Sequence, residues 1–214
     1  MTEWTISASW RWRPLSPFGV EIDGDLARLS TEGTGVEHRF FLDLYRQYGL
    51  IVAHRQTLDR MAQAGLMEII GPILERAGES GYISTDKGGA SLSELRFHAD
   101  GAYASRPLDA LSLHAVDVVD GASSTCFVSA ERAFAALPAP LRAMLSGLSV
   151  RMMSPAFEIL GERICDIRDP SFMQSGIKPL VHRQEGTGRP CLWASEMHAA
   201  SIEVMDWEEG RALL

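Results

Sequence analysis

A histidine and an aspartate lie two positions apart near the middle of the chain, at His98 and Asp100. Side chains alternate faces along an extended segment, so residues two positions apart point to the same side. An imidazole nitrogen and a carboxylate oxygen that converge supply two of the three ligands of a 2-His-1-carboxylate iron site. A chain with this many histidines and aspartates contains about 0.3 such pairs by chance, so the spacing also fits a surface histidine beside a turn aspartate.

The elements that must position this pair belong to a chain of ordinary globular composition. Its 214 residues are 46% hydrophobic and 22% charged, which is enough to bury a substantial core in one large domain spanning residues 1–214. A net charge of −8 argues against nucleic acid or an anionic membrane surface as a partner. No apolar stretch approaches the ~20 residues of a transmembrane helix.

The cysteines and the first residues predict a cytoplasmic protein. Cys126, Cys165 and Cys191 are odd in number, irregularly spaced and without a C-x-x-C pair. This pattern is typical of reduced thiols and unlike a disulfide framework or a zinc site. Residues 1–14 are rich in tryptophan and have no apolar core, so they do not resemble a secretory signal.

Before the His98 segment, the apolar pattern alternates between strand and helix spacing. We expect a strand over 18–22, a helix over 36–48, a strand over 50–53 and a helix over 58–70. Residues 78–93 are rich in glycine and serine and predict a loop that leads into His98. Such a loop is either a lid that contacts substrate or a plain surface connection.

After the His98 segment, short strands and helices alternate again, with an irregular excursion over 154–177. Apolar alternation, proline positions and a glycine-rich turn at 185–189 define these elements. We expect strands over 111–119, 125–128 and 149–153, helices over 129–136 and 140–147, a hairpin of strands 179–184 and 190–194, and a helix over 207–214.

Several of these segments carry short motifs in a fixed order. They are Pro-Leu-Ser-Pro-Phe-Gly-Val-Glu-Ile at 14–22, Tyr-Gly-Leu-Ile-Val at 48–52, Phe-His-Ala-Asp at 97–100, Asp-Gly-Ala-Ser-Ser-Thr-Cys-Phe at 120–127, the helical pair at 134–138 and 145–148, Lys-Pro-Leu-Val-His-Arg at 178–183 and Thr-Gly-Arg-Pro-Cys-Leu-Trp at 187–193. The ordered set resembles the TauD/TfdA-type family of Fe(II)- and 2-oxoglutarate-dependent dioxygenases, the taurine dioxygenase group. Phe97 stands where the W-H-T-D metal motif of the family has tryptophan.

The resemblance implies an α+β fold, a double-stranded β-helix (jelly roll) with flanking helices. It implies iron held by His98, Asp100 and a later histidine, and 2-oxoglutarate whose far carboxylate meets Thr125 and an arginine. It implies oxidation of a small organic substrate, by hydroxylation or desaturation, with release of succinate and CO₂. The expected partners are this substrate and O₂, and self-association into a homo-oligomer is left open. Thr125 is alternatively a simple β-branched strand residue.

One departure from the family bears on activity. The later histidine and the arginine of the family lie beyond the segment that ends here at Leu214, so we expect the last barrel strands to be missing. His114, His182 and His198 are the histidines that could replace the absent ligand, although each also fits an ordinary strand or loop position. The alternative function is therefore a non-catalytic, truncated relative that binds a small molecule or a partner.

Two residues are candidates for substrate contact. Glu94 lies four residues before His98, where the family places a polar contact, and its carboxylate would favour a cationic or hydroxylated group. His198 aligns near a family position that faces the substrate, where it could hydrogen-bond an anionic group. Each is alternatively a loop residue without a functional role.

Overall fold

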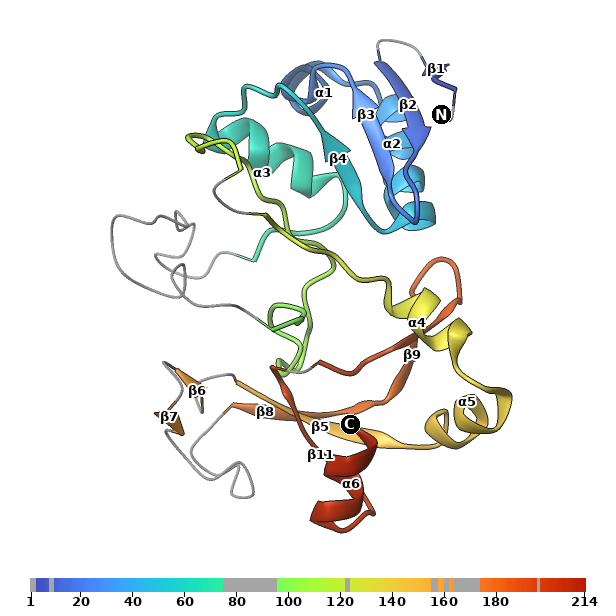
Figure 1. The fold of residues 1–214 in the computed structure, drawn as a ribbon. Helices are drawn as coiled ribbons and strands as arrows, with labels where there is room; N and C mark the ends of the chain where they lie inside the picture. Colours follow the sequence, from blue (N-terminus) through green and yellow to red (C-terminus); the bar gives the residue numbers. More distant parts are fainter. Residues whose placement is uncertain are drawn as a thin grey trace. The chain divides into compact units, whose positions relative to one another are not determined.

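A computed structural model describes residues 3–7, 10–74, 96–121, 124–154, 158–159, 162–163, 174–195 and 197–214. Contacts divide the chain into two compact units (Figure 1). The first unit comprises Met1–Ala77 with Asp109–Thr125, and the second comprises Gly78–Leu108 with Cys126–Leu214. That the two make one domain over 1–214 stays a prediction.

The first unit is built on a four-stranded sheet in the order β1-β2-β3-β4 (Figure 1). Its strands are β1 (Thr5–Ser7), β2 (Trp10–Pro14), β3 (Val20–Asp23) and β4 (Ile51–Ala53). Pairs β1–β2 and β2–β3 are antiparallel, whereas β3–β4 is parallel because two helices lie between these strands in the chain. The strands predicted over 18–22 and 50–53 are confirmed as β3 and β4.

Three helices accompany this sheet: α1 (Leu26–Glu32), α2 (Gly35–Tyr48) and α3 (Arg60–Glu68). Helix α2 begins with a capping box, in which the Thr34 side chain accepts from Glu37 N–H and the Glu37 carboxylate accepts from Thr34 N–H. It ends at Gly49, whose φ of 71° lies in the left-handed region that glycine adopts without strain. The helices predicted over 36–48 and 58–70 are confirmed as α2 and α3, whereas α1 had no prediction.

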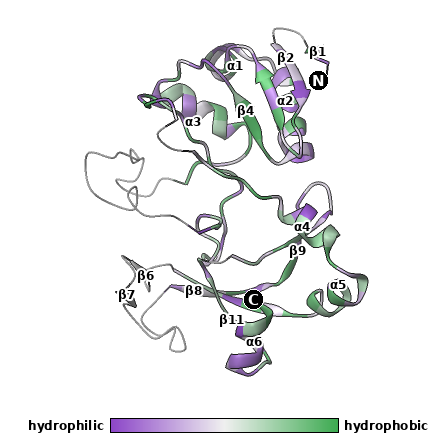
Figure 2. Cartoon of the chain, viewed as in Figure 1, coloured by the Kyte–Doolittle hydropathy of each residue, from purple (hydrophilic) through white to green (hydrophobic). Residues whose placement is uncertain are grey.

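The core of the first unit lies between the sheet and these helices. Val20 and Ile22 of β3 have no exposed surface, and Phe41 and Leu44 of α2 are 3% exposed each. Burying each such side chain contributes roughly 1.5–3 kcal/mol. Strand β4 is coloured as hydrophobic in Figure 2, and its partly buried residues Ile51 and Ala53 pack against this core. The buried members of this core are Trp10, Val20, Ile22, Leu26, Leu29, Phe41, Leu44 and Leu66.

The second unit contains a three-stranded antiparallel sheet in the order β11-β5-β8. Its strands are β5 (Ser149–Met153), β8 (Ser175–Pro179) and β11 (Ala199–Ile202). A hairpin of β9 (Val181–Arg183) and β10 (Pro190–Leu192) follows β8, and a two-stranded pair is formed by β6 (Glu158–Ile159) and β7 (Glu162–Arg163). The prediction of β5 and of the hairpin is confirmed. Strand β11 was not predicted.

Three short helices belong to the second unit: α4 (Ala130–Ala136), α5 (Ala139–Leu145) and α6 (Trp207–Leu213). Ser129 caps α4 and Asp206 caps α6, each through its side-chain oxygen. The three helices predicted in this half of the chain are therefore confirmed. The buried members of the core are Leu145, Val150, Met152, Leu180, Ala199 and Ile202. Within the described ranges, no helix is both long and apolar enough to cross a membrane.

The α+β class is confirmed, but the described strands form four separate sheets and not a clear jelly roll. The strands predicted over 111–119 and 125–128 are wrong, because both stretches lack regular structure. Their apolar residues stay in solvent: Leu111 is 61% exposed and Val118 is 70% exposed. Alternation provides a strand only when a neighbouring strand accepts its hydrogen bonds, and no described strand pairs with these stretches.

Candidate metal and substrate site

His98 and Asp100 lie at the start of a turn in the second unit, and not on the extended strand that their spacing predicted. The N–H of Ala102 donates to the carbonyl of Ala99, at 3.2 Å, and Gly101 has a φ of 65°. A residue in this left-handed conformation reverses the chain, and glycine is the residue that adopts it at least cost. The turn, and not strand alternation, therefore brings the two side chains together.

The imidazole of His98 and the carboxylate of Asp100 contact each other directly. The Nε2 atom of His98 is 3.2 Å from Oδ1 of Asp100, and the two side chains are 25% and 48% exposed. On the other edge of the ring, the Nδ1–H donates to the carbonyl oxygen of Arg96, 2.8 Å away. A carbonyl only accepts hydrogen bonds, so the proton of the neutral ring belongs on Nδ1 and a lone pair remains on Nε2.

This arrangement presents two electron-pair donors to the same point. A neutral Nε2 and a carboxylate oxygen at 3.2 Å attract each other only when a proton or a cation lies between them. Ligating histidines commonly donate their other N–H to a backbone carbonyl, as His98 does to Arg96. The pair thus fits two positions of a 2-His-1-carboxylate iron site. Among the described residues, no group of three His, Cys, Asp or Glu side chains could hold a metal ion.

His198 lies directly before β11 and is 2% exposed. Its Nδ1–H donates to the carbonyl of Met153 in the neighbouring strand β5, at 2.9 Å, and its own carbonyl accepts from Met153 N–H at 2.9 Å. The opposite ring nitrogen, Nε2, is buried and has no hydrogen-bond partner within the described part of the chain. Burial lowers the pKa of His198, and the nearby His98 ring lowers it too, while Met153 and Asp100 act in the opposite direction.

The His198 ring packs against two aromatic side chains of the turn that carries His98 and Asp100. The centroid of the His98 ring is 5.9 Å away, edge to face, and that of Tyr103 is 5.3 Å away. His198 was considered in the sequence both as a substitute metal ligand and as a substrate contact. The structure places it beside His98, so it belongs to the same site.

Ser195 connects the two histidine segments, and sequence reasoning did not identify it. Its hydroxyl donates to the carbonyl of Phe97, directly before His98, at 3.3 Å. The same oxygen accepts from the backbone N–H of His198 at 3.2 Å. Serine three residues before the donor N–H is a common local turn pattern, and Ser-Glu-Met-His at 195–198 carries that signal.

The other candidates do not join this cluster among the described residues. Glu94 falls outside the described residues. Thr125 belongs to the first unit, where it is exposed and lacks regular structure. His114 hydrogen-bonds the Gln56 carbonyl at 3.3 Å within the first unit, and His182 is an exposed residue of β9 whose ring packs on Trp193.

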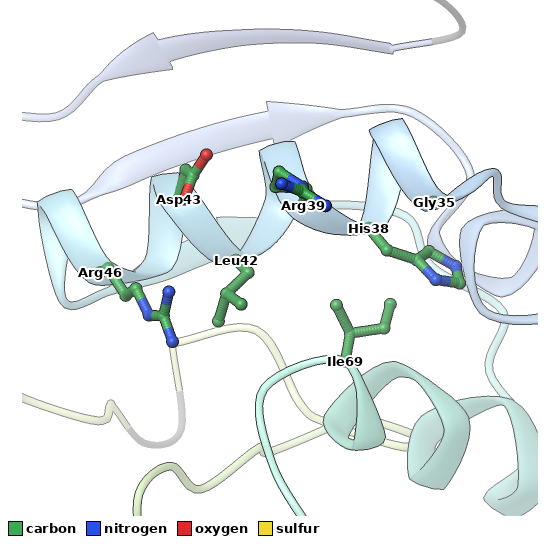
Figure 3. Close-up of a pocket in the computed structure, with 7 residues that line it drawn as sticks. All are labelled: Gly35, His38, Arg39, Leu42, Asp43, Arg46 and Ile69. Atoms are coloured by element: carbon green, nitrogen blue, oxygen red, sulfur yellow. The ribbon is translucent and has the colours of Figure 1, made fainter. Parts of the chain in front are cut away.

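Two hollows, of about 500 and about 440 Å³, are lined by residues of the first unit and contain none of the candidate site residues. The larger one lies along α2 (Figure 3). Leu42 and Ile69 face each other across it, and His38 and Arg46 flank them. His38 is already engaged, because its Nε2 lies 2.9 Å from the carbonyl of Leu29. Size alone therefore does not identify the reactive site of this chain.

A model of the taurine catabolism dioxygenase TauD, TfdA family matches residues 11–214. The solved structure of AAD-2 in complex with Mn(II) and N-oxalylglycine is similar at a TM-score of 0.72 and 20% identity, over 96% of this chain and 77% of that one. A taurine dioxygenase from Burkholderia xenovorans is similar at a TM-score of 0.67 and 20% identity, over 96% of this chain and 71% of that one. Comparison with curated proteins found no match.

Proposed function

Because the chain belongs to the TauD/TfdA family of dioxygenases, we propose that it is an Fe(II)- and 2-oxoglutarate-dependent dioxygenase. The substrate is a small organic molecule, which is hydroxylated or desaturated with release of succinate and CO₂. The observation that carries the proposal is the convergence of His98 Nε2 and Asp100 Oδ1 at 3.2 Å. The described strands would then be part of a double-stranded β-helix, the fold that the family implies.

His98 and Asp100 hold the iron in this proposal. The hydrogen bond from His98 Nδ1–H to Arg96 fixes the tautomer, so Nε2 keeps its lone pair for the metal. Asp100 supplies the carboxylate, and its 48% exposure leaves the pair open to solvent and ligands. When bound, iron and 2-oxoglutarate supply the oxidising chemistry, with decarboxylation of the cosubstrate coupled to attack on a substrate C–H bond. Mn(II) and N-oxalylglycine bound to AAD-2 support a metal and a small acid as ligands here.

Three further residues have roles in the proposal. The hydroxyl of Thr125 donates a hydrogen bond to the far carboxylate of 2-oxoglutarate. Glu94 and His198 contact the substrate. For His198, burial beside the His98 ring excludes water from one side of the metal pair, which strengthens electrostatic interactions there.

Anaerobic titration of the 214-residue chain with Fe(II) and then 2-oxoglutarate tests the proposal. We expect the weak visible charge-transfer band that develops when 2-oxoglutarate chelates bound iron. The matched control is Fe(II) with succinate, which lacks the keto oxygen and should give no band. If 2-oxoglutarate gives no band at saturating iron, this chain does not form the iron–2-oxoglutarate chelate and the proposed function fails for it.

A second candidate is a non-catalytic relative that binds a small molecule or a partner. It is favoured by one observation, that the described residues contain no group of three side chains able to hold a metal ion. Substrate-coupled release of succinate separates the two. Succinate formed in proportion to an oxidised substrate excludes the non-catalytic function, whereas binding of 2-oxoglutarate without turnover supports it.

A further inference from the structure

The proposed function does not specify which kind of group contacts the Nε2 atom of His198 in the second unit. The side chain is 2% exposed and Nε2 has no partner among the described residues. A buried polar atom left without a hydrogen bond costs about 1–3 kcal/mol, so natural proteins rarely keep one without a reason. Its position beside the metal pair suggests that a bound molecule provides the missing contact.

The hydrogen bonds around the ring decide what kind of contact Nε2 can make. Nδ1 lies 2.9 Å from the Met153 carbonyl oxygen, which only accepts, so Nδ1 carries the proton. In the neutral ring Nε2 is then an acceptor. Met153 N–H also donates to the His198 carbonyl at 2.9 Å, and Ser195 Oγ accepts from His198 N–H. The two main-chain bonds hold the His198 backbone, and the bond from Nδ1 holds the ring, so a ring flip that exchanges the two nitrogens would break the bond to Met153.

The nearest side chains do not provide a donor to this acceptor. The Nδ1–H of His98 is used by the Arg96 carbonyl, and its Nε2 faces Asp100. Tyr103 contacts His198 through its ring, at 5.3 Å between centroids. Among the described residues, therefore, no donor satisfies Nε2.

We propose that His198 Nε2 is a specificity-determining acceptor, which receives a hydrogen bond from a hydroxyl or N–H group of the substrate. This inference rests on the proposed function, because the rings of His198 and His98 are only 5.9 Å apart and the bound donor would lie beside the metal pair. The site accordingly selects hydroxylated or amino substrates over analogues that present only acceptors there. An acceptor repels a sulfonate or carboxylate oxygen, so the earlier expectation that His198 binds an anionic group is reversed.

The first measurement concerns the tautomer of the free protein. In chain labelled with ¹⁵N-histidine, long-range ¹H–¹⁵N spectra distinguish a protonated ring nitrogen from a bare one, and the signals that disappear in His198→Phe assign the ring. We expect His198 to carry its proton on Nδ1 and none on Nε2 at neutral pH. A proton on Nε2 overturns the proposal, because that nitrogen would then be a donor.

The second measurement uses benzyl alcohol and benzyl methyl ether, which differ at the O–H donor. We expect the alcohol to shift the His198 Nε2 signal and to bind about five- to tenfold more tightly than the ether, as one hydrogen bond provides. His198→Phe should reduce this ratio to about one, whereas the control variant His182→Phe, on the exposed β9 strand, should retain it. Equal binding of both probes, no shift of Nε2 with either, or tighter binding of benzenesulfonate overturns the proposal.

Mn(II) binding, followed by electron paramagnetic resonance, distinguishes this inference from the proposed function. His198→Phe should leave the affinity for Mn(II) within about twofold of the parent chain, because a substrate acceptor is not a metal ligand. A loss of tenfold or more would instead make His198 a ligand and overturn its role as acceptor. If the parent chain binds no Mn(II), the proposed function fails, while the tautomer and the alcohol preference still report on His198.

Discussion

Glu21 in the first unit and His198 in the second are both buried ionisable side chains, yet their surroundings are opposite. Glu21 is 9% exposed and its Oε2 accepts from Arg13 Nε at 2.7 Å and contacts Nη2 at 2.6 Å, while His54 lies 3.5 Å from Oε1. His198 is 2% exposed and one ring nitrogen has no described partner. The Glu21 carboxylate has the hydrogen-bond partners of a structural group, whereas Nε2 of the His198 ring has none among the described residues.

The comparison shows that a missing partner identifies a site only when its surroundings are reactive. The indole N–H groups of Trp10 and Trp12 are also buried without a described hydrogen-bond partner, but both rings pack against Phe40 inside the core of the first unit. His198 instead packs against His98, which faces Asp100. Trp193 Nε1 in the second unit is also buried without a described partner, so the chemistry of the neighbouring residue, and not the unpaired atom alone, distinguishes His198.

The largest effect is expected at the metal pair. His98→Ala removes one of two assigned ligands, so we expect the affinity for Mn(II) to fall at least about tenfold. The melting temperature should change little, because a side chain at the start of an exposed turn adds little to the core. Electron paramagnetic resonance and a thermal melt measure the two quantities. Unchanged Mn(II) binding in the variant would contradict the metal assignment.

For the Glu21–Arg13 pair, we expect a loss of stability instead. Arg13→Ala leaves the buried Glu21 carboxylate without the guanidinium that contacts its Oε2, and we expect about 2 kcal/mol less free energy of unfolding. Urea unfolding followed by tryptophan fluorescence reports on it, since Trp10 and Trp12 lie in the same unit. Arg11→Ala is the control, because Arg11 pairs with Asp23 at the surface and its loss should leave the unfolding free energy nearly unchanged. Equal effects of both variants would show that Glu21 does not depend on its pairing.

The sequence predicted elements whose signals are local. The helix α2 and the strand β5 follow from the spacing of their apolar residues, whereas the capping box of Thr34 and Glu37 was not predicted. It failed over 111–119, because alternation does not reveal whether another strand is available for pairing. Three side-chain contacts hold residues 109–114 within the first unit: Tyr45 O–H donates to the Asp109 carbonyl, Gln63 donates to Ser112 Oγ, and His114 contacts the Gln56 carbonyl.

The candidate site was predicted only in part, because only some of its residues are close to one another in the sequence. His98 and Asp100 are close in sequence, so their spacing was informative even though a turn, and not a strand, joins them. The acceptor character of His198 depends on the Met153 carbonyl, 45 residues away, and on burial directly before a strand that was not predicted. Residue spacing does not predict which group donates and which accepts in such a long-range hydrogen bond.

Ser195 allows a test of the contacts around His198, with a smaller expected effect on stability. Ser195→Ala removes the hydroxyl that accepts from His198 N–H and donates to the Phe97 carbonyl. We expect about 1 kcal/mol less free energy of unfolding, together with a shifted ring signal of His198 in ¹⁵N spectra. Ser201→Ala in β11 is a matched control. A variant with an unchanged His198 signal would show that Ser195 does not position the two histidine segments.

The smallest effect on stability is expected at Tyr45. Like Glu21, its polar group has a described partner, because the hydroxyl donates to the carbonyl of Asp109 at 2.6 Å. Burial raises the pKa of Tyr45, and the negative charge of Asp109 raises it further. Because the folded pKa exceeds the ordinary value of 10, the folded state holds this proton more tightly than the unfolded state does. The stability that this provides is complete below about pH 10 and is lost as the pH rises through the folded pKa.

Tyr45→Phe should therefore cost about 0.5–1 kcal/mol at neutral pH, from the lost hydrogen bond, and less in strong alkali. Urea unfolding at pH 7 and above pH 10, with phenolate absorbance compared between the parent chain and the variant, measures both effects. The paired hydroxyl should titrate late and the two chains should converge in stability as it does. A difference in stability that grows above pH 10 would mean that the contact with Asp109 does not hold the proton of Tyr45.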